Sequence, residues 1–375
     1  MRVIFLYTSY GAAGVGTTPP WDKEQESKNH FVGIHGIETE GYLYMLVALK
    51  KLRVIDDLLV FIESNRHTGH KIVLGTKCYV VPRIDYVEDF LKDDDVLFVR
   101  GGWRGWYDPF LLKMQKQKRW LINYAANTGR QRWTVWDIVL SDLSTKHSYD
   151  KRGRFWFQFS KPINPEIFHP KQIDRDYDVC IGASKIHDKK AQWRVIDALI
   201  KHKEIYGTTL KCVMPGAIRW RGIETPQVVP KINKHDLNVE QPGFVDRYAL
   251  STIMNRSKVF VYLGNSGEND RGPLEATCVG CPTLLGGTSR HAPFLRDNEK
   301  GILVSKDCTD PSIVAKEIQG LLDIHDENLR RQITSHYERN NGFYSVVIPK
   351  MSRLFDTIRM NPTPSVDALR KEYRI

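Results

Sequence analysis

The chain has 375 residues, of which 41% are hydrophobic and 26% charged, which is typical of a folded protein with enough chain for two domains. No apolar run approaches the roughly 20 residues of a membrane-spanning helix, and the first residues lack the features of a signal peptide. We therefore expect a cytoplasmic protein, or one at a cytosolic membrane face. The formal net charge of +11 indicates an anionic partner: nucleic acid, an acidic membrane surface or a phosphorylated ligand.

The first half of the chain predicts a doubly wound α/β domain, because short apolar strands alternate with helical segments. A strand at residues 2–7 is followed by a glycine-containing loop at 10–29, in which a proline pair prevents the helix that a dinucleotide fingerprint needs. A second glycine segment, ending at Gly36, leads into a helix at about 38–51. This pattern predicts either an anion-binding site or an ordinary helix N-terminus without a ligand. Further strands are expected at 58–62, 71–74, 78–81, 96–99 and 121–125, with 138–140 as the last one.

A segment with three prolines, at residues 162–170, is interpreted as an interdomain linker. After it the strand–helix pattern restarts, and the tail at 344–360 is helical. Strands are expected at 177–181, 210–214, 259–263, 283–285 and 302–304, and helices at 192–201, 248–255 and 311–323.

A polar, glycine-rich loop leaves the carboxyl end of strand 259–263 and leads into a helix. Ligands of open α/β sheets bind at such strand ends, and backbone N–H groups at a helix start favour anions such as a diphosphate. Glu275 lies just inside this helix, where its carboxylate could accept hydrogen bonds from a ribose. A strand–loop–helix connection with a solvated acidic loop explains the same residues.

Lys185 and Lys190 follow strand 177–181 and lie five positions apart, close enough to grip one diphosphate. The alternative is a solvated basic loop, because His187 and Lys189 lie in the same stretch.

Several enzyme classes are disfavoured because their motifs are missing from the sequence. A P-loop, a Gly-x-Ser-x-Gly elbow and a His-Glu-x-x-His helix are absent, which argues against a P-loop NTPase, an α/β-hydrolase and a zinc protease. Cys278 and Cys281 have metal-like spacing without a second pair, so we predict buried structural thiols. The run Asp93, Asp94 and Asp95 precedes a strand and predicts a solvated turn rather than a metal site.

The second half of the chain resembles retaining GT-B glycosyltransferases of the family-four type. Residues 163–170 are similar to the interdomain segment of that family, which ends in Phe-x-Pro. Strand 177–181 with Gly182, Lys185 and Lys190 is similar to its strand, basic pair and helix, with Lys185 where the family usually has arginine.

A further match lies in the donor loop and helix of the family. Residues 272–276, with 280–282 after them, are similar to this element. The likeness covers roughly residues 160–305, with a weaker echo in the first half of the chain.

The resemblance implies the GT-B fold, an α/β architecture of two Rossmann-like doubly wound domains that face a central cleft. It implies an acceptor-binding domain at 1–162, a linker at 163–173, a nucleotide-sugar domain at 174–343 and a helix at 344–375 that packs back on the first domain. The implied enzyme transfers a hexosyl or pentosyl group from a nucleotide-diphosphate sugar to an acceptor hydroxyl, with retention at the anomeric carbon. The nucleotide sugar is a co-substrate, and neither a metal nor another cofactor is implied.

The resemblance also implies roles for individual residues. Glu275 binds the donor ribose, Phe244 and Val245 line the base pocket, and Gly36 approaches the diphosphate from the first domain. The implied donor-binding residues are Gly36, Phe244, Val245, Arg271, Gly272, Pro273, Leu274 and Glu275, of which 271–274 act through their backbone. The implied catalytic residues are Lys185, Lys190 and Glu268.

The chain departs from the family at two positions. The family has two glutamates eight positions apart, whereas Glu268, the nearest acid, lies seven positions before Glu275. The family often has a histidine at the end of a strand in the first domain, and the matching place here is around Asn127, which cannot perform the same proton chemistry.

The acceptor is predicted from the first domain, which is rich in arginine and aromatic residues. The candidate acceptor-binding residues are Trp103, Arg104, Asn127, Arg130 and Arg132. Such residues suit a glycan or glycolipid, at or near a membrane, and we expect this class first. They also suit DNA with a hydroxylated base, as in viral DNA glycosyltransferases. A third alternative is a GT-B-fold epimerase or a non-catalytic binding protein, and a fourth is that the aromatics belong to the core.

Overall fold

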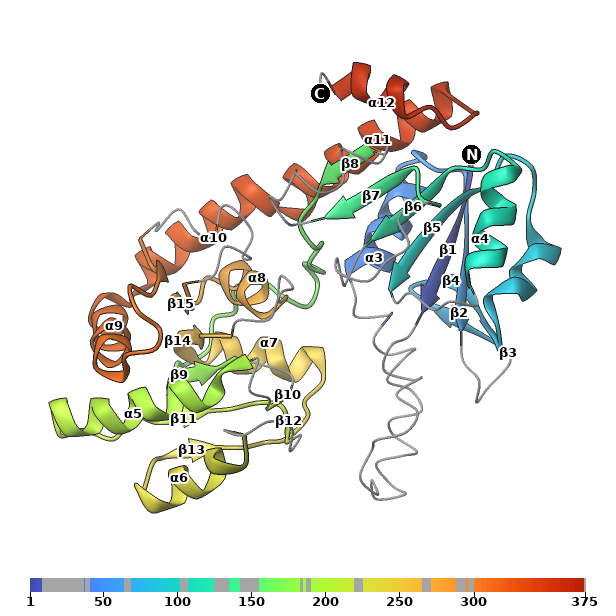
Figure 1. Cartoon of the computed structure of the whole chain (residues 1–375). Helices are drawn as coiled ribbons and strands as arrows, with labels where there is room; N and C mark the ends of the chain where they lie inside the picture. Colours follow the sequence, from blue (N-terminus) through green and yellow to red (C-terminus); the bar gives the residue numbers. More distant parts are fainter. Residues whose placement is uncertain are drawn as a thin grey trace. The chain divides into compact units, whose positions relative to one another are not determined.

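The computed structural model describes residues 1–8, 37, 41–63, 69–101, 107–124, 135–141, 155–182, 185–186, 190–218, 225–264, 271–287, 295 and 300–373. The chain forms two compact units, Met1–Asn164 with Tyr344–Ile375, and Pro165–Phe343. Each unit contains its own sheet, of eight strands in the first and six in the second (Figure 1). The predicted α/β class with parallel sheets is therefore confirmed.

The sheet of the first unit has the strand order β3-β4-β2-β1-β5-β6-β7-β8. Its strands are β1 (Arg2–Thr8), β2 (Asp57–Glu63), β3 (Gly69–Val73), β4 (Thr76–Val81), β5 (Val96–Gly101), β6 (Leu121–Tyr124), β7 (Ile138–Ser141) and β8 (Phe155–Gln158). The β3–β4 pair is antiparallel and every other neighbouring pair is parallel.

The apolar runs that predict these strands are buried in the sheet. Val3, Ile4 and Phe5 of β1 and Leu97 and Phe98 of β5 are 0% exposed. Central parallel strands are covered on both faces, so their sequences are apolar throughout rather than alternating with polar residues. The helical segments of this half are α3 (Gly41–Lys51), the 3₁₀ segment η1 (Ile84–Phe90) and α4 (Tyr107–Lys116).

The C-terminal segment completes the first unit. The unit resumes at Tyr344, within the π-helical turn η7 (Phe343–Val347), and continues with α11 (Ile348–Met360) and α12 (Val366–Tyr373). Helix α11 lies against α3, and α12 lies against β8. The Trp120 indole nitrogen donates to the Asn361 carbonyl oxygen at 2.7 Å, and the Tyr373 ring centroid lies 5.3 Å from that of Phe155. Residues from the first and last parts of the chain thus share one core.

Replacing Trp120 with phenylalanine is expected to lower the free energy of unfolding by about 1 kcal/mol, because the Asn361 carbonyl loses its donor while most of the ring packing remains. Urea unfolding measures the change. The matched control is Tyr344→Phe, which removes an exposed hydrogen bond, at 3.2 Å, between the Tyr344 and Tyr44 hydroxyls of the same unit. Water replaces that bond, so the control is expected to change stability by less than about 0.5 kcal/mol. Equal effects of the two variants would contradict the buried role of Trp120.

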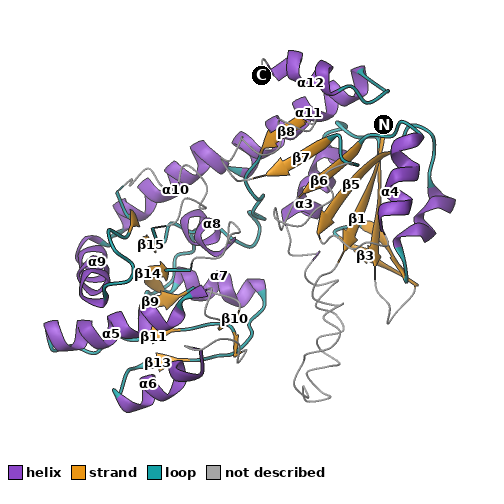
Figure 2. Ribbon diagram, in the orientation of Figure 1, coloured by secondary structure: helices purple, strands orange, loops and turns teal. Residues whose placement is uncertain are grey.

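The sheet of the second unit has the order β13-β11-β9-β14-β15-β16, and all of its neighbouring strands are parallel. The strands are β9 (Tyr177–Ile181), β11 (Cys212–Val213), β13 (Val239–Glu240), β14 (Ser257–Tyr262), β15 (Thr283–Leu285) and β16 (Ile302–Val304), and a separate pair joins β10 (Lys185–Ile186) to β12 (Ala217–Ile218). The helices are α5 (Gln192–Tyr206), α6 (Val228–Lys234), α7 (Arg247–Asn255), α8 (Arg271–Cys278), α9 (Pro311–Ile324) and α10 (Glu327–Asn341) (Figure 2).

This strand order has a switch point between β9 and β14. From β9 the next strands in the chain, β11 and β13, add on one side, whereas β14, β15 and β16 add on the other. Loops that leave the carboxyl ends of the two central strands therefore diverge, and the space between them is where open α/β sheets bind ligands.

Several elements differ from the sequence-based expectations. Strand 138–140 is not the last of its sheet, because β8 follows it. Trp156 in β8 is 9% exposed and belongs to the core. The strand expected at 210–214 is only Cys212–Val213, and helices α6 and α10 have no counterpart in the sequence-based expectations. The helix expected at 344–375 is divided into α11 and α12. The aspartate run is also only partly solvated, because Asp95 is 1% exposed and its carboxylate accepts from the Arg2 guanidinium at 2.7 and 2.8 Å.

Candidate functional site

The ring of Phe260, in β14, lies under two glycines at the switch point. A Cβ atom added at Gly182, directly after β9, would lie 2.2 Å from the Phe260 ring, and one added at Gly272, in the first turn of α8, would lie 3.2 Å from it. Phe260 is 1% exposed, so the ring fills the space that side chains at these glycines would need. The backbone of both loops therefore comes close to the sheet at this edge.

Lys190 follows β9 and lies against the loop that follows β14. Its Nζ is 3.5 Å from the Tyr262 hydroxyl and 5.8 Å from the centroid of that ring. A Cβ atom at Gly264 would lie 3.1 Å from the Lys190 Cα and 2.5 Å from the Tyr262 hydroxyl oxygen. Only glycine fits there, and the contact brings the ammonium of Lys190 to the carboxyl edge of the two central strands.

Glu275 lies in α8, the helix that follows β14, and its side chain is 2% exposed. A carboxylate removed from water requires hydrogen-bond donors or a cation. The guanidinium of Arg247 supplies both, because its Nη1 donates to the Glu275 Oε1. The side chain of Arg247 is 30% exposed, so one end of this ion pair reaches solvent.

Helix α7 begins beside this ion pair. The Asp246 carboxylate caps the helix by accepting from the Ala249 backbone N–H at 2.7 Å, which places Arg247 at its first residue. Phe244 and Tyr248, on either side of the helix start, are 54% and 51% exposed. Exposed aromatic rings at a helix start can stack on a flat ring of a ligand.

The predicted donor helix forms as expected, with α8 beginning at Arg271. Leu274 is 0% exposed, and the side chain of Pro273 is also buried. Both side chains pack against the interior of the second unit, and a role of 271–274 through their backbone stays a prediction. Because Pro273 has no N–H, the first turn of α8 carries the backbone N–H groups of Arg271 and Gly272.

The structure thus brings Lys190 and Glu275 to the edge where α7 and α8 begin. Val245 is partly buried just before the capping residue of α7. The backbone of Lys185 lies in β10, and its side chain lies outside the described part of the chain. Also outside the described residues are Gly36, Trp103, Arg104, Asn127, Arg130, Arg132 and Glu268.

Sequence reasoning did not single out Arg247 or Tyr262 as contacts of the two candidate ligand-binding residues. Arg247 is 28 positions from Glu275, and Tyr262 is 72 from Lys190, so spacing alone could not identify these pairs.

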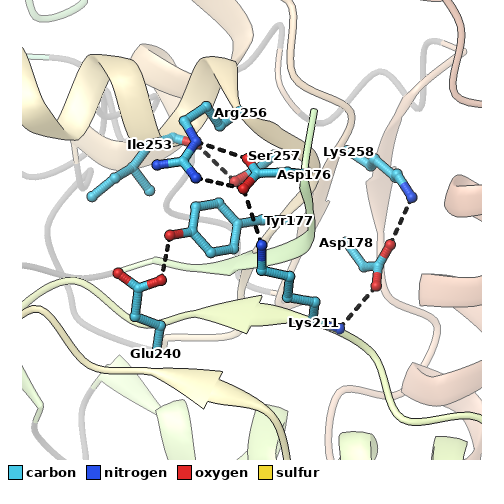
Figure 3. A network of polar contacts seen from close by, with 9 residues as sticks. All are labelled: Asp176, Tyr177, Asp178, Lys211, Glu240, Ile253, Arg256, Ser257 and Lys258. Atoms are coloured by element: carbon cyan, nitrogen blue, oxygen red, sulfur yellow. Dashed lines mark hydrogen bonds and ion pairs between the residues drawn. The ribbon is translucent and has the colours of Figure 1, made fainter. Parts of the chain in front are cut away.

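A different polar cluster occupies the opposite edge of the same sheet (Figure 3). Arg256, at the end of α7, donates from Nε to Asp176 at 2.7 Å, and Lys211 donates to the same carboxylate at 3.0 Å. These bonds lower the pKa of Asp176 well below its usual range, Arg256 first. The Tyr177 ring lies between the two cations, 4.6 Å from the Arg256 guanidinium and 4.9 Å from the Lys211 ammonium. All partners are internal, so this cluster holds strand starts together.

The prediction of buried thiols is confirmed for Cys278 and Cys281, which are buried and free. Burial raises the pKa of Cys281 to about 12, so the thiol stays protonated at neutral pH. Within the ranges that the structure describes, no group of three His, Cys, Asp or Glu side chains could hold a metal ion. Across those same ranges, none of the helices has the length and apolar character needed to cross a bilayer.

Comparisons with known proteins relate the chain to others by structure alone. No protein-family model and no curated protein matches the sequence. Among solved structures, sucrose-phosphate synthase from Thermosynechococcus elongatus is similar over 96% of this chain and 100% of its own, with a TM-score of 0.67 and 12% identity. Anabaena HepE in complex with UDP-glucose is similar over 95% and 100%, with a TM-score of 0.63 and 12% identity.

A third similar structure is that of trehalose-6-phosphate from E. coli bound with UDP-2-fluoro glucose, which covers 98% of this chain and 100% of its own. Its TM-score is 0.62 and its identity 10%. Since these likenesses extend over nearly the whole chain and agree with the two doubly wound sheets, the protein has the GT-B fold, with two Rossmann-like domains.

Proposed function

We propose that the protein is a glycosyltransferase that moves a sugar from a nucleotide-diphosphate sugar to an acceptor hydroxyl, with retention of the anomeric configuration. The observation that carries the proposal is that Lys190 lies against the end of β14, the strand after which α8 with Glu275 follows, at the switch point of the second unit. A nucleoside diphosphate needs a cation and N–H donors for its phosphates and an acceptor for its ribose hydroxyls, and this edge supplies all three.

The chemistry follows from the charge that develops on the donor. When the bond from the anomeric carbon to the diphosphate breaks, negative charge grows on the leaving phosphate oxygen. Lys190, with Lys185 of β10 and the N–H groups of Arg271 and Gly272, would stabilise that charge. Glu275 would hold the ribose, and Phe244 and Val245 would contact the base. Glu268 would act near the sugar, and Gly36 near the diphosphate.

The donor is proposed to be a UDP-sugar, because HepE is known in complex with UDP-glucose and has a similar fold over 95% of this chain. The acceptor is proposed to be a glycan or glycolipid, bound through Trp103, Arg104, Asn127, Arg130 and Arg132 of the first domain. The proposed boundaries are 1–162 for that domain and 174–343 for the donor domain.

Replacing Glu275 with alanine is expected to lower kcat/KM for the donor about 100-fold or more, because two hydrogen bonds from ribose hydroxyls to a carboxylate are lost. The measurement is a donor-by-acceptor screen with mass detection of transfer or hydrolysis, and proton NMR of the product gives the anomeric configuration. The control is Glu204→Ala, an exposed glutamate on α5 that pairs with Lys201. The proposal fails if no nucleotide sugar binds or turns over in the wild type, or if Glu275→Ala behaves like the control.

DNA is the second candidate acceptor, and the net charge of +11 favours it. Electrophoretic mobility of duplex DNA across a salt series separates the two candidates. Binding that weakens steeply with salt is expected for DNA, whereas no binding at about 50 mM salt excludes it.

A further inference from the structure

The start of α7 touches the start of α8 through one ion pair, between Arg247 and Glu275. Arg247 is the first residue of α7, and Glu275 lies in the second turn of α8. Helices of a doubly wound sheet run back along the strands, so both of these helix starts lie at the carboxyl edge, where the switch point is. The ion pair therefore belongs to the candidate site rather than to the sheet's opposite edge.

The burial of Glu275 makes its charge and orientation depend on its partner. With 2% of its side chain exposed, the carboxylate cannot rely on water to stay ionised. A carboxylate has about four lone-pair positions, and the bond from Arg247 Nη1 to Oε1 occupies one of them. The ion pair thus keeps the group charged while leaving acceptor capacity for other donors.

We infer that Arg247 is a positioning residue for nucleotide binding: it holds the Glu275 carboxylate ionised and turned so that it accepts from the 2′- and 3′-hydroxyls of a ribose. This inference rests on the proposed function and adds to it the residue that orders the ribose acceptor before the ligand arrives. Arg247 contacts Glu275 and would act through that carboxylate. A carboxylate already held in place loses less rotational freedom on binding, so the ordered pair binds more tightly than a free glutamate.

The pair also sets a preference for ribose over deoxyribose. A charge-assisted hydrogen bond from the 2′-hydroxyl is worth about 10- to 100-fold in affinity, provided that the carboxylate stays charged and aligned. Without Arg247, the buried carboxylate loses the donor that orients it, and the 2′-hydroxyl loses an aligned acceptor. The ratio of the dissociation constants for the 2′-deoxynucleotide and the ribonucleotide therefore reports the position of Glu275. A general loss of stability would not change this ratio selectively.

The experiment is titration calorimetry with UDP, GDP and ADP, followed by the tightest of these against its 2′-deoxy counterpart. Arg247→Met keeps the length of the side chain but removes the charge and the donors. It is expected to weaken ribonucleotide binding about 10-fold or more. The preference in affinity for the ribonucleotide over the 2′-deoxynucleotide is expected to fall below about 3-fold. Arg247→Lys restores the charge and is expected to recover most of the ratio. In turnover assays KM for the donor rises, while kcat stays within about 3-fold.

The matched control is Arg256→Gln, which removes an arginine ion pair from the other end of the same helix, at the edge drawn in Figure 3. It is expected to leave both dissociation constants unchanged. If Arg247→Met fails to fold by circular dichroism, Arg247→Gln replaces it with the same expected losses. If the Arg247 variants keep wild-type affinity and wild-type ribose preference while Glu275→Gln loses them, only the positioning role of Arg247 is overturned. Wild-type binding in Glu275→Gln as well overturns the proposed function.

Discussion

Replacing Arg330 with methionine is expected to destabilise the second unit by about 3 kcal/mol. The side chain of Arg330 is 3% exposed, and burial lowers the pKa of its guanidinium. Its donors reach the Val279 carbonyl at 3.1 Å, the Lys171 carbonyl at 2.9 Å and the Asn255 side-chain oxygen. Methionine matches the stem but leaves these buried acceptors with fewer donors, and each such loss costs about 1–3 kcal/mol.

The substitution is expected to weaken a hydrogen-bond network rather than a single contact, because the Asn255 side chain uses both its oxygen and its nitrogen in the same network. Its oxygen also accepts from the Lys171 backbone N–H at 2.7 Å, and its amide nitrogen donates to the His169 carbonyl at 3.1 Å. Arg330 and Asn255 together fasten the segment that enters the second unit to α7 and α10.

Urea unfolding, monitored by tryptophan fluorescence and far-ultraviolet circular dichroism, measures the loss. Arg331→Met is the control, because Arg331 is the next residue of α10 and is exposed. Its expected effect is within about 0.5 kcal/mol. Similar midpoints for the two variants would show that the buried bonds contribute nothing net.

Replacing Gly182 with alanine is expected to cost about 1–3 kcal/mol and to weaken nucleotide binding, because the new methyl group would overlap the Phe260 ring. The ring is held in the centre of the sheet, in a strand between β9 and β15, so it cannot turn aside without moving its neighbours. A Cβ atom at Gly272 would also lie 3.2 Å from this ring, which links the disturbance to the first turn of α8.

A second substitution tests this cause directly. In the double variant Gly182→Ala/Phe260→Leu, the smaller side chain makes room for the methyl group, so the two costs are expected to be less than additive by about 1 kcal/mol or more. Calorimetric binding of UDP and urea unfolding are measured on both single variants and on the double variant. Additive costs would mean that Gly182 is required for a reason other than the Phe260 ring.

The central strands of the two sheets were predictable because burial on both faces imposes a simple sequence pattern. Val259, Val261 and Leu263 are all buried, and the run is apolar without alternation. Helix α10 was not predictable in the same way. Its buried face carries Arg330 and His336 as well as leucine and isoleucine, so its apolar period is weak.

The residues of the candidate site also differ in how far the sequence predicts them. Glu275 and Lys190 could be proposed because each stands at a fixed offset from an apolar strand and a glycine. Their partners could not, since Arg247 and Tyr262 meet them only through the packing of separate elements. A partner chosen by tertiary contact leaves no local period or motif in the sequence.

The discontinuous first unit has a consequence for synthesis on the ribosome. All of Pro165–Phe343 leaves the exit tunnel before the residues that cover β8 and receive the Trp120 hydrogen bond. At about 5–20 residues per second, synthesis of Pro165–Phe343 takes roughly ten seconds or more, and the first half waits that long for its last helices. Until then the edge of β8, with Phe155 and Phe157, is uncovered by α12, so the nascent first half is the stage at which a chaperone would be needed.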